Sequence, residues 1–262
     1  MNLILNRLFG VNLVEISMHS TESWSNHVTK YELNHESEGT LGYIYLDLYP
    51  RQGKYMHAAH FTVLCGRDRS YQSLSYQLPV VALVCNFQNG IRLEFHELET
   101  LFHEFGHALH SLLSRSKFQH LSGTRTALDF VEIPSHLFEL FVHDFRVLQL
   151  FARDENTHEV LDESRFHQVM KKNDLFCAMN LQNQVLYSAV DLAFHSEYTT
   201  SQWSNDCGSI YSELQQKFTR IVPQSSDVYS HSILAHLGGY STGYYTYLYA
   251  KVFAAQIWNE VF

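Results

Sequence analysis

The chain has 262 residues with a formal net charge of −9, 45% apolar residues and 14% aromatic residues. This length and composition are typical of one globular domain, or of one large piece of a bigger protein. No stretch concentrates enough Lys or Arg to neutralise a run of phosphates, which argues against nucleic acid as a partner. No run of about 18 apolar residues is present, so the sequence has no candidate for a membrane-spanning helix. We expect a peptide or small-molecule partner.

The N-terminal residues and the four cysteines bear on targeting and on disulfide bonding. Residues 1–10 are apolar, but they hold one basic residue and no small-residue cleavage site, so they make a poor signal or transit peptide. The four cysteines lie far apart without a Cys-x-x-Cys pair, which argues against a zinc knuckle or a disulfide framework. We expect buried free thiols.

Three segments in the first third of the chain predict strands. Residues 41–49 alternate between Tyr or Asp and aliphatic side chains, which indicates a half-buried strand. Residues 58–64 and 78–87 are rich in β-branched and aromatic residues. The three together predict a small antiparallel sheet. An edge strand of that sheet could bind an extended peptide through main-chain hydrogen bonds, although a purely structural sheet explains the pattern equally well.

Helical periodicity dominates the rest of the chain. From residue 94 to residue 114 the apolar side chains recur at helical spacing and predict an amphipathic helix; they are Leu98, Leu101, Phe102, Phe105, Leu109 and Leu112. Residues 131–151 predict a second helix, and residues 159–220 are mainly helical with a polar connection at 199–208. A Gly- and Tyr-rich segment at 238–249 precedes a last helix, whose periodicity still runs at residue 262 without a capping residue.

The first of these helices carries a His-Glu-x-x-His motif at residues 103–107. Side chains four residues apart on a helix project from the same face, so His103 and His107 can bind one metal ion together. Two imidazoles and a carboxylate suit zinc and leave a fourth position open for water. Glu104 then stands where a general base acts on that water. Gly106 costs about 1 kcal/mol of helix propensity, which indicates a local reason for its small size.

The third metal ligand is expected from the next helix, and Glu132 at its start is our choice. The alternative is that Asp129 and Glu132 form a capping arrangement at a helix N-terminus with no role in metal binding. Glu99, Asp129 and Glu139 are unranked candidates for the carboxylates that orient the histidines.

The segment from His236 to Tyr247 could donate hydrogen bonds to an oxyanion, because its glycines let the backbone approach a substrate and its phenols donate without charge. The alternative is an aromatic helix start buried in a core.

Several longer motifs resemble the thimet oligopeptidase (M3) family of zinc peptidases, and within it the mitochondrial intermediate peptidase branch. The most specific stretches are Leu-Gly-Tyr-Ile-Tyr-Leu-Asp at 41–47, His-Phe-Thr at 60–62, Phe-His-Glu-Phe-Gly-His-Ala-Leu-His-Ser at 102–111, Asp-Phe-Val-Glu-Ile-Pro-Ser at 129–135 and His-Leu-Gly-Gly-Tyr at 236–240. The resemblance implies that His103, His107 and Glu132 bind one zinc ion and that Glu104 is the general base. It further implies substrate or oxyanion contacts for four residues, which are His236, Tyr240, Tyr244 and Tyr247.

The resemblance also implies a zincin-like fold that is mainly α, with a small sheet beside the metal helix, as part of a two-lobed peptidase with a deep channel. Family members are much longer, so residues 1–262 are expected to form a partial catalytic domain that lacks the N-terminal lobe and the last C-terminal helices.

The implied function is a zinc metalloendopeptidase that removes N-terminal octapeptides from imported precursors in the mitochondrial matrix. One alternative is a cytoplasmic thimet-type oligopeptidase acting on short peptides, since residues 46–51 lean toward that branch. A third is a truncated, inactive fragment that binds zinc or peptide. The sequence predicts neither the cleavage-site preference nor the oligomeric state.

Overall fold

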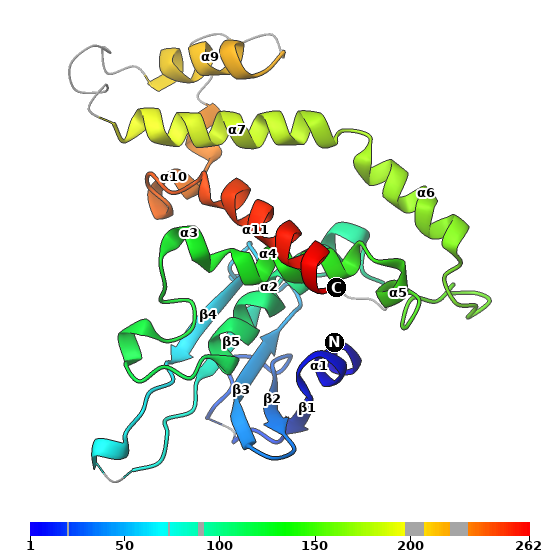
Figure 1. Cartoon of the computed structure of the whole chain (residues 1–262), viewed down its shortest axis with the longest axis vertical. Coiled ribbons are helices and arrows are strands. Elements are labelled where there is room, and N and C mark those ends of the chain that lie inside the picture. Colours follow the sequence, from blue (N-terminus) through cyan, green and yellow to red (C-terminus); the bar gives the residue numbers. More distant parts are fainter. Residues whose placement is uncertain (20, 73, 89–91, 197–206, 221–229) are drawn as a thin grey trace. The chain divides into compact units, whose positions relative to one another are not determined.

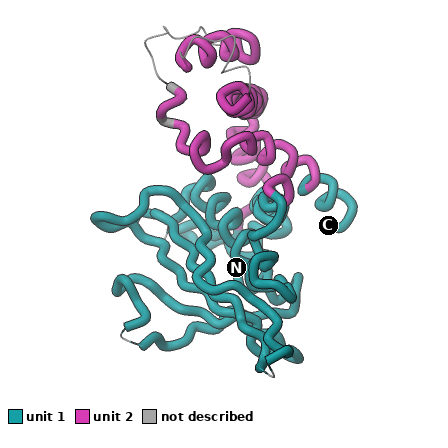
Figure 2. The backbone as a smooth tube through the Cα atoms, turned by 90° about the vertical axis from the view of Figure 1, so that its left-hand side faces the viewer, with its two compact units in different colours: residues 1–127, 131–160, 254–262 teal, residues 128–130, 161–253 magenta. Residues whose placement is uncertain are grey.

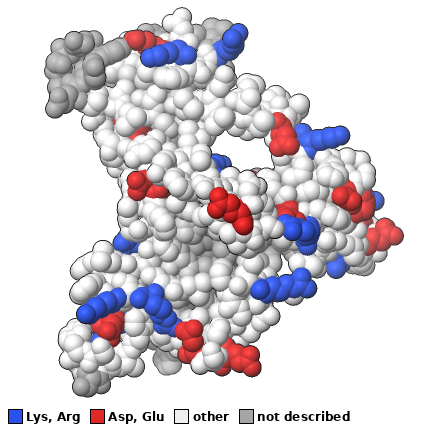
Figure 3. Space-filling model, in the orientation of Figure 1, with Lys and Arg blue, Asp and Glu red and all other residues white. Residues whose placement is uncertain are grey.

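The computed structural model divides into two compact units (Figure 2), the first made of residues 1–127, 131–160 and 254–262 and the second of residues 128–130 and 161–253. The structure describes residues 1–19, 21–72, 74–88, 92–196, 207–220 and 230–262. No helix in these ranges is both long and apolar enough to span a membrane. On the face seen in Figure 3, Lys and Arg side chains are interspersed with Asp and Glu side chains.

The first unit is built on a five-stranded sheet with the strand order β1-β2-β3-β5-β4 (Figure 1). The strands are β1 (Val11–Ile16), β2 (Thr29–His35), β3 (Gly39–Asp47), β4 (Ala59–Leu64) and β5 (Val80–Val84). The sequence predicted the last three and missed the first two, whose side chains alternate weakly. β1 and β4 form the two edges of the sheet.

The expectation of a purely antiparallel sheet is wrong for one pair of strands. β3 and β5 are parallel, with Tyr43 opposite Val80, whereas the other neighbours are antiparallel. The chain leaves β3, forms the edge strand β4 and returns as β5 between them. Because β5 reverses the direction of β4, it must run in the same direction as β3.

The two sheet edges differ in how their backbone groups are satisfied. Helix α1 (Asn2–Phe9) covers the outer edge of β1, where the side-chain amide of Asn2 donates to the carbonyl of Leu13 at 3.2 Å and accepts from its N–H at 2.8 Å. Among the described residues no strand pairs with the outer edge of β4. An open edge can add a further extended chain by main-chain hydrogen bonds.

Helix α2 (Phe95–Leu113) packs against β3, β4 and β5 on one side and against α4 (Ile133–Val142) on the other. It begins with a capping box, in which the side chains of Glu94 and Glu97 satisfy the first backbone N–H groups. The predicted apolar stripe is confirmed, because Phe102, Phe105, Leu109 and Leu112 are buried, while Leu98 and Leu101 are partly buried.

The helix predicted at 131–151 is three separate helices. They are α3 (Leu128–Val131), α4 and α5 (Phe145–Leu148). Asp144 breaks the run because it adopts an extended backbone and its carboxylate caps α5 by accepting from the N–H of Arg146 at 2.7 Å. The side chain of an N-cap aspartate accepts a hydrogen bond from one of the first backbone N–H groups of a helix, which have no partner within the helix.

β3 is buried on both faces, so the expectation of a half-buried strand is wrong. The ring of Tyr45 packs against Trp24, and the carboxylate of Asp47 is 1% exposed. Asp47 accepts hydrogen bonds from Trp24 and Arg51 and forms an ion pair with the buried Lys54 at 2.9 Å. Burial disfavours the charged carboxylate, but Arg51, Trp24 and Lys54 outweigh this and lower the pKa of Asp47 to about 2.

The regular elements in the described part of the second unit are all helices. It contains α6 (Glu163–Asp174), α7 (Cys177–Phe194), α9 (Cys207–Phe218), η3 (Ser230–Ile233), α10 (His236–Gly239) and the first half of α11 (Thr246–Val261). The predicted helical region at 159–220 is thus confirmed where it is described, and most of its polar connection at 199–208 lies outside the described residues. All four cysteines are free. The expected burial holds for Cys65 and Cys85 but not for the exposed Cys177 and Cys207.

Candidate metal centre and peptidase site

The two histidines of the motif lie side by side on α2, with ring centroids 4.9 Å apart and ring planes at 82°. Both are partly buried, because this face of the helix lies under α4. Their Nε2 atoms face one carboxylate. The Oε2 atom of Glu132 lies 3.5 Å from Nε2 of His103 and 3.1 Å from Nε2 of His107.

Glu132 stands directly before α4 and is 2% exposed. Its side chain makes no capping hydrogen bond to the helix, so the capping alternative is wrong for this residue. Instead the hydroxyl of Ser135 donates to the Glu132 carbonyl at 2.8 Å and to Oε2 at 3.0 Å. Ser135 therefore holds the carboxylate toward the two imidazoles.

Gly106 allows α4 to come this close. A Cβ atom at this position would lie 2.5 Å from the Cα of Ser135 and 2.6 Å from the carbonyl oxygen of Pro134. Both contacts involve backbone atoms, which cannot rotate away. Because Gly106 has no side chain, α4 packs closely against α2, and the carboxylate of Glu132 comes within reach of the imidazoles of His103 and His107.

The carboxylate of Glu139 forms hydrogen bonds with two histidines, one of which is His103 of the motif. Its Oε1 accepts from Nδ1 of His103 at 2.6 Å, and its Oε2 accepts from Nδ1 of His136 at 3.0 Å. Burial disfavours the charge of Glu139, yet these hydrogen bonds hold its pKa well below the ordinary range. Burial likewise opposes the imidazolium of His103, and Glu139 outweighs this and raises its pKa.

The other two carboxylates considered from the sequence have different surroundings. Glu99 accepts from Nε2 of His143 at 2.9 Å. Asp129 is exposed and belongs to the second unit. Of the three candidates, Glu139 is the one with a hydrogen bond to a histidine of the motif.

Glu104 lies between the histidines and strand β4. It is 7% exposed, and the backbone of His60 lies near its carboxylate. Burial raises the pKa of Glu104, although His103 and His107 partly oppose the shift. A raised pKa suits a carboxylate that must take up and release a proton near neutral pH.

The ring of His60, on β4, contacts two residues of α2. Its Nε2 lies 3.1 Å from the hydroxyl of Ser111, and its ring centroid lies 6.2 Å from that of His107. Burial, with His107 and His110 nearby, lowers the pKa of His60 to about 3, so its ring is neutral. β4 is thus linked to the metal helix through the side chain of His60.

The donor set fits a zinc ion. One ligand atom from each of His103, His107 and Glu132 lies within 4.8 Å of the others, a spacing that a single ion can bridge. The trio of His103, His136 and Glu139 meets the same distance criterion. There, however, Glu139 already bonds both Nδ1 atoms directly, as a carboxylate does when it orients a zinc-binding histidine.

In the second unit, four predicted residues form one aromatic cluster. The ring of His236 lies 5.5 Å to 6.1 Å, between centroids, from Tyr240, Tyr244 and Tyr247. The Tyr244 phenol is buried and donates to Oε1 of Gln184 at 3.0 Å. Burial, with Tyr187 nearby, raises the pKa of Tyr244 to about 12.

The turn that carries these tyrosines is held by Asp191, a fully buried residue of α7 that the sequence did not single out. Its carboxylate accepts from the N–H of Thr242 at 3.1 Å and from the N–H of Tyr244 at 2.9 Å. Thr242 has φ of 63°, a left-handed conformation that is uncommon for a residue other than glycine. The side chain of Asp191 stabilises that turn.

Two histidines from one helix, a carboxylate at the start of α4 and a buried glutamate near an open sheet edge are the arrangement of the metallopeptidase class. The chain belongs to peptidase family M3, whose model matches residues 1–262. This confirms the family that the motifs predicted. It also agrees with a mainly helical fold around a small sheet.

Curated relatives carry the name mitochondrial intermediate peptidase. The one from Arabidopsis thaliana is 41% identical over 266 residues, and the one from Homo sapiens is 37% identical over 267 residues. Each match covers 100% of this chain and 37% of the relative. A relative from Candida glabrata is 34% identical over 282 residues, covering 99% of the chain and 37% of its own length. The chain thus spans little more than a third of these relatives.

Proposed function

We propose that this chain carries the catalytic centre of a zinc metalloendopeptidase of the mitochondrial intermediate peptidase type. The observation that carries the proposal is the convergence of His103, His107 and Glu132 beside the buried Glu104. The names of the relatives support the branch and a mitochondrial location. The substrate is then a peptide or a precursor protein.

His103, His107 and Glu132 would hold the zinc ion. When bound, zinc lowers the pKa of water in its open position to about 7 and polarises the scissile carbonyl. Glu139 keeps the proton of His103 on Nδ1, so that Nε2 presents its lone pair toward Glu132 and the metal position. Ser135 orients the carboxylate of Glu132 by donating a hydrogen bond to its Oε2 atom.

Glu104 performs the proton transfers. Its carboxylate accepts a proton from the water that attacks the peptide carbonyl and delivers that proton to the leaving amine. The nearby backbone of His60 favours the charged carboxylate, whereas burial keeps the pKa of Glu104 above that of an exposed glutamate. A base with a raised pKa gives up its proton less readily to bulk water and is suited to passing it to the amine.

The open edge of β4 would align the substrate. An extended peptide can pair with its backbone groups, and the same strand contacts the base through His60. The side chains of Phe61 and Val63 are 45% and 60% exposed, which leaves apolar surface for substrate side chains. The opposite edge of the sheet is already covered by α1.

His236, Tyr240 and Tyr247 would contact the substrate or its oxyanion, since a phenol donates a hydrogen bond without carrying charge. Tyr244 requires a further step, because its hydroxyl already donates to Gln184 and must exchange that partner to serve a substrate. Its buried ring also packs against Tyr247, with centroids 5.3 Å apart, and so supports the cluster.

The test is hydrolysis of an internally quenched peptide by the zinc-loaded chain and by Glu104→Gln. The proposal predicts turnover in the wild type, and at least a hundredfold loss in the variant with zinc content unchanged. Zinc binding without turnover in either protein would favour the alternative of a chain that binds metal or peptide but does not catalyse. That alternative is kept because the chain spans only 37% of its relatives.

A further inference from the structure

Two connections in the first unit concentrate positive charge. Residues 66–78, between β4 and β5, and residues 114–125, after α2, together hold four arginines and one lysine but a single acidic residue, Asp68. The whole chain has 18 cationic and 27 acidic side chains. The two connections are therefore opposite in sign to the rest of the chain.

The fold brings these two connections together, although neither is conspicuously basic by itself. The N–H of Asp68 donates to the carbonyl of Lys117 at 3.3 Å. The phenol of Tyr76 donates to the carbonyl of Ser116 at 3.3 Å, and the guanidinium of Arg115 lies 5.1 Å from the centre of the same ring. These contacts join the two connections into one surface.

We call this surface the basic patch; its cationic side chains are Arg67, Arg69, Arg115 and Lys117. Two carboxylates partly offset them. Glu38 lies 3.7 Å from Arg115. Asp68 accepts from the N–H of Ser70 at 2.8 Å, and this bond, with Lys117 nearby, holds the pKa of Asp68 below its ordinary value. With four cations against two carboxylates, the basic patch keeps a positive charge.

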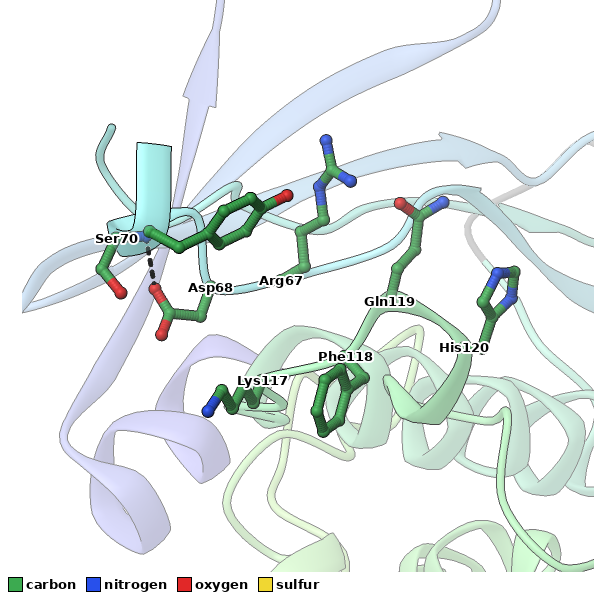
Figure 4. A pocket seen from close by; sticks show the side chains of 8 residues that line it. Arg67, Asp68, Ser70, Lys117, Phe118, Gln119 and His120 are labelled. Atoms are coloured by element: carbon green, nitrogen blue, oxygen red, sulfur yellow. Dashed lines mark hydrogen bonds between the residues drawn. The ribbon is translucent and has the colours of Figure 1, made fainter. Parts of the chain in front are cut away.

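Arg67 borders an open cavity of about 560 Å³ between the two connections (Figure 4). Its Nε is buried and has no hydrogen-bond partner among the described residues. In Figure 4 the ends of Arg67 and Gln119 extend to one side of the cavity, whereas those of Asp68 and Lys117 extend to the other. A buried donor without an acceptor is unfavourable, and a guanidinium matches the oxygens of a phosphate group.

Large apolar side chains stand exposed beside these charges. They are Tyr71, Leu121, Phe118 and Leu74, with exposed fractions of 73%, 65%, 60% and 49%. The rings of Tyr71 and Phe118 line the same cavity as Arg67 and Lys117, so the cations and the rings share one face. Leu121 follows directly, because its N–H donates to the carbonyl of Phe118 at 3.1 Å.

This combination of charge and apolar surface selects the kind of partner. Leader segments of mitochondrial precursors are rich in Arg and poor in acidic residues, so the basic patch would repel them. A nucleic acid matches the charge but offers no apolar environment to the two leucines. The surface of an anionic membrane offers both, because negative headgroups lie directly above the acyl chains.

We propose that the basic patch is a docking surface for an anionic phospholipid membrane. Arg67, Arg115 and Lys117 contact lipid phosphates, while the four exposed apolar side chains enter the boundary between headgroups and acyl chains. None of these residues belongs to the metal centre. The inference therefore goes beyond the proposed function and can be tested without any turnover.

The experiment is cosedimentation of the whole chain with vesicles of phosphatidylcholine alone or mixed with cardiolipin, an anionic lipid. We expect about tenfold or tighter binding to the anionic vesicles, weakened by added salt. Arg67→Gln and Lys117→Gln should each weaken it about fivefold, and Leu121→Ser about fivefold to tenfold.

Two matched controls lie at exposed positions of the second unit, Lys171→Gln and Leu175→Ser, and both should bind as the wild type does. Circular dichroism verifies that each variant is folded.

Absence of binding to the anionic vesicles, equal binding to both kinds of vesicle, or equal losses in the patch variants and the controls would overturn the proposal. Competition with polyglutamate separates a membrane from an acidic protein partner. Polyglutamate that displaces the chain from the vesicles, together with full vesicle binding by Leu121→Ser, would show that the patch recognises charge alone and would also overturn it.

Discussion

Oε1 of Glu139 lies 2.6 Å from Nδ1 of His103, while Nε2 of the same ring faces Glu132 at 3.5 Å. A carboxylate that accepts the Nδ1 proton fixes both the tautomer and the orientation of a metal-binding imidazole. Glu139 comes from α4, two turns beyond Glu132, so one helix provides both the carboxylate at the metal position and the carboxylate behind His103.

We predict that Glu139→Gln weakens zinc binding about tenfold to a hundredfold, because the amide orients His103 less strongly and does not raise its basicity. Competition with a chromophoric chelator measures the affinity. Glu99→Gln is the matched control, since Glu99 bonds His143 outside the metal centre. An unchanged affinity in Glu139→Gln, or an equal loss in both variants, would remove the special role of Glu139.

Gly106→Ala should separate α2 from α4. Its Cβ would lie 2.5 Å from the Cα of Ser135, so we predict a loss of about 1 to 3 kcal/mol in the free energy of unfolding, with weaker zinc binding. Urea denaturation of the zinc-free chain gives the first quantity. Gly238→Ala serves as the control, because nothing lies within 4 Å of a Cβ at that position. A stable Gly106→Ala chain with normal zinc affinity would contradict the close packing.

The pair of Asp47 and Lys54 predicts an acid-sensitive contribution to stability. The pKa of Asp47 is lowered from 3.8 to about 2, so the folded state favours the charged form. This contribution is fully present above the unfolded pKa of 3.8 and disappears as pH falls through 2. A shift of this size corresponds to about 2 kcal/mol.

Asp47→Asn measures this contribution directly. We predict a less stable variant at neutral pH, since Lys54 stays buried without a charged partner, and a stability difference that narrows below pH of about 4. Urea midpoints of both proteins across that range provide the data. A difference that is independent of pH would mean that Asp47 acts through packing alone.

Asp191→Ala should loosen the tyrosine turn without touching the metal residues. It leaves the N–H groups of Thr242 and Tyr244 without their acceptor, at a cost of about 2 kcal/mol. Hydrogen exchange of the Tyr244 amide should accelerate, while zinc affinity stays the same. Asp174→Ala, a change at an exposed position of α6, is the control. An unaltered exchange rate at Tyr244 would show that the turn is held by other contacts.

The parts of the site that local spacing encodes could be predicted from the sequence. The two histidines are four residues apart on one helix, and Glu132 begins the next helix but one, so periodicity and proximity in sequence were sufficient to bring the three together. The same holds for Gly106, whose place inside a helix indicates a local constraint, and the backbone of Pro134 and Ser135 is that constraint.

The parts that depend on distant pairings could not be predicted. His60 reaches α2 across 51 positions of sequence to meet Ser111, and Asp191 reaches Thr242 across another 51. No local period indicates such contacts. The parallel pairing of β3 with β5 was missed for a similar reason, because strand direction depends on the path of the chain and not on the side-chain pattern.

The most direct test of the account is the zinc stoichiometry and affinity of the chain, measured beside His107→Ala, Glu132→Ala and Glu104→Gln. The account predicts one zinc ion per chain, retained in Glu104→Gln and weakened at least a hundredfold in the other two variants. A folded wild-type chain that binds no zinc, or a His107→Ala chain that binds it as tightly as the wild type, would contradict the central claim.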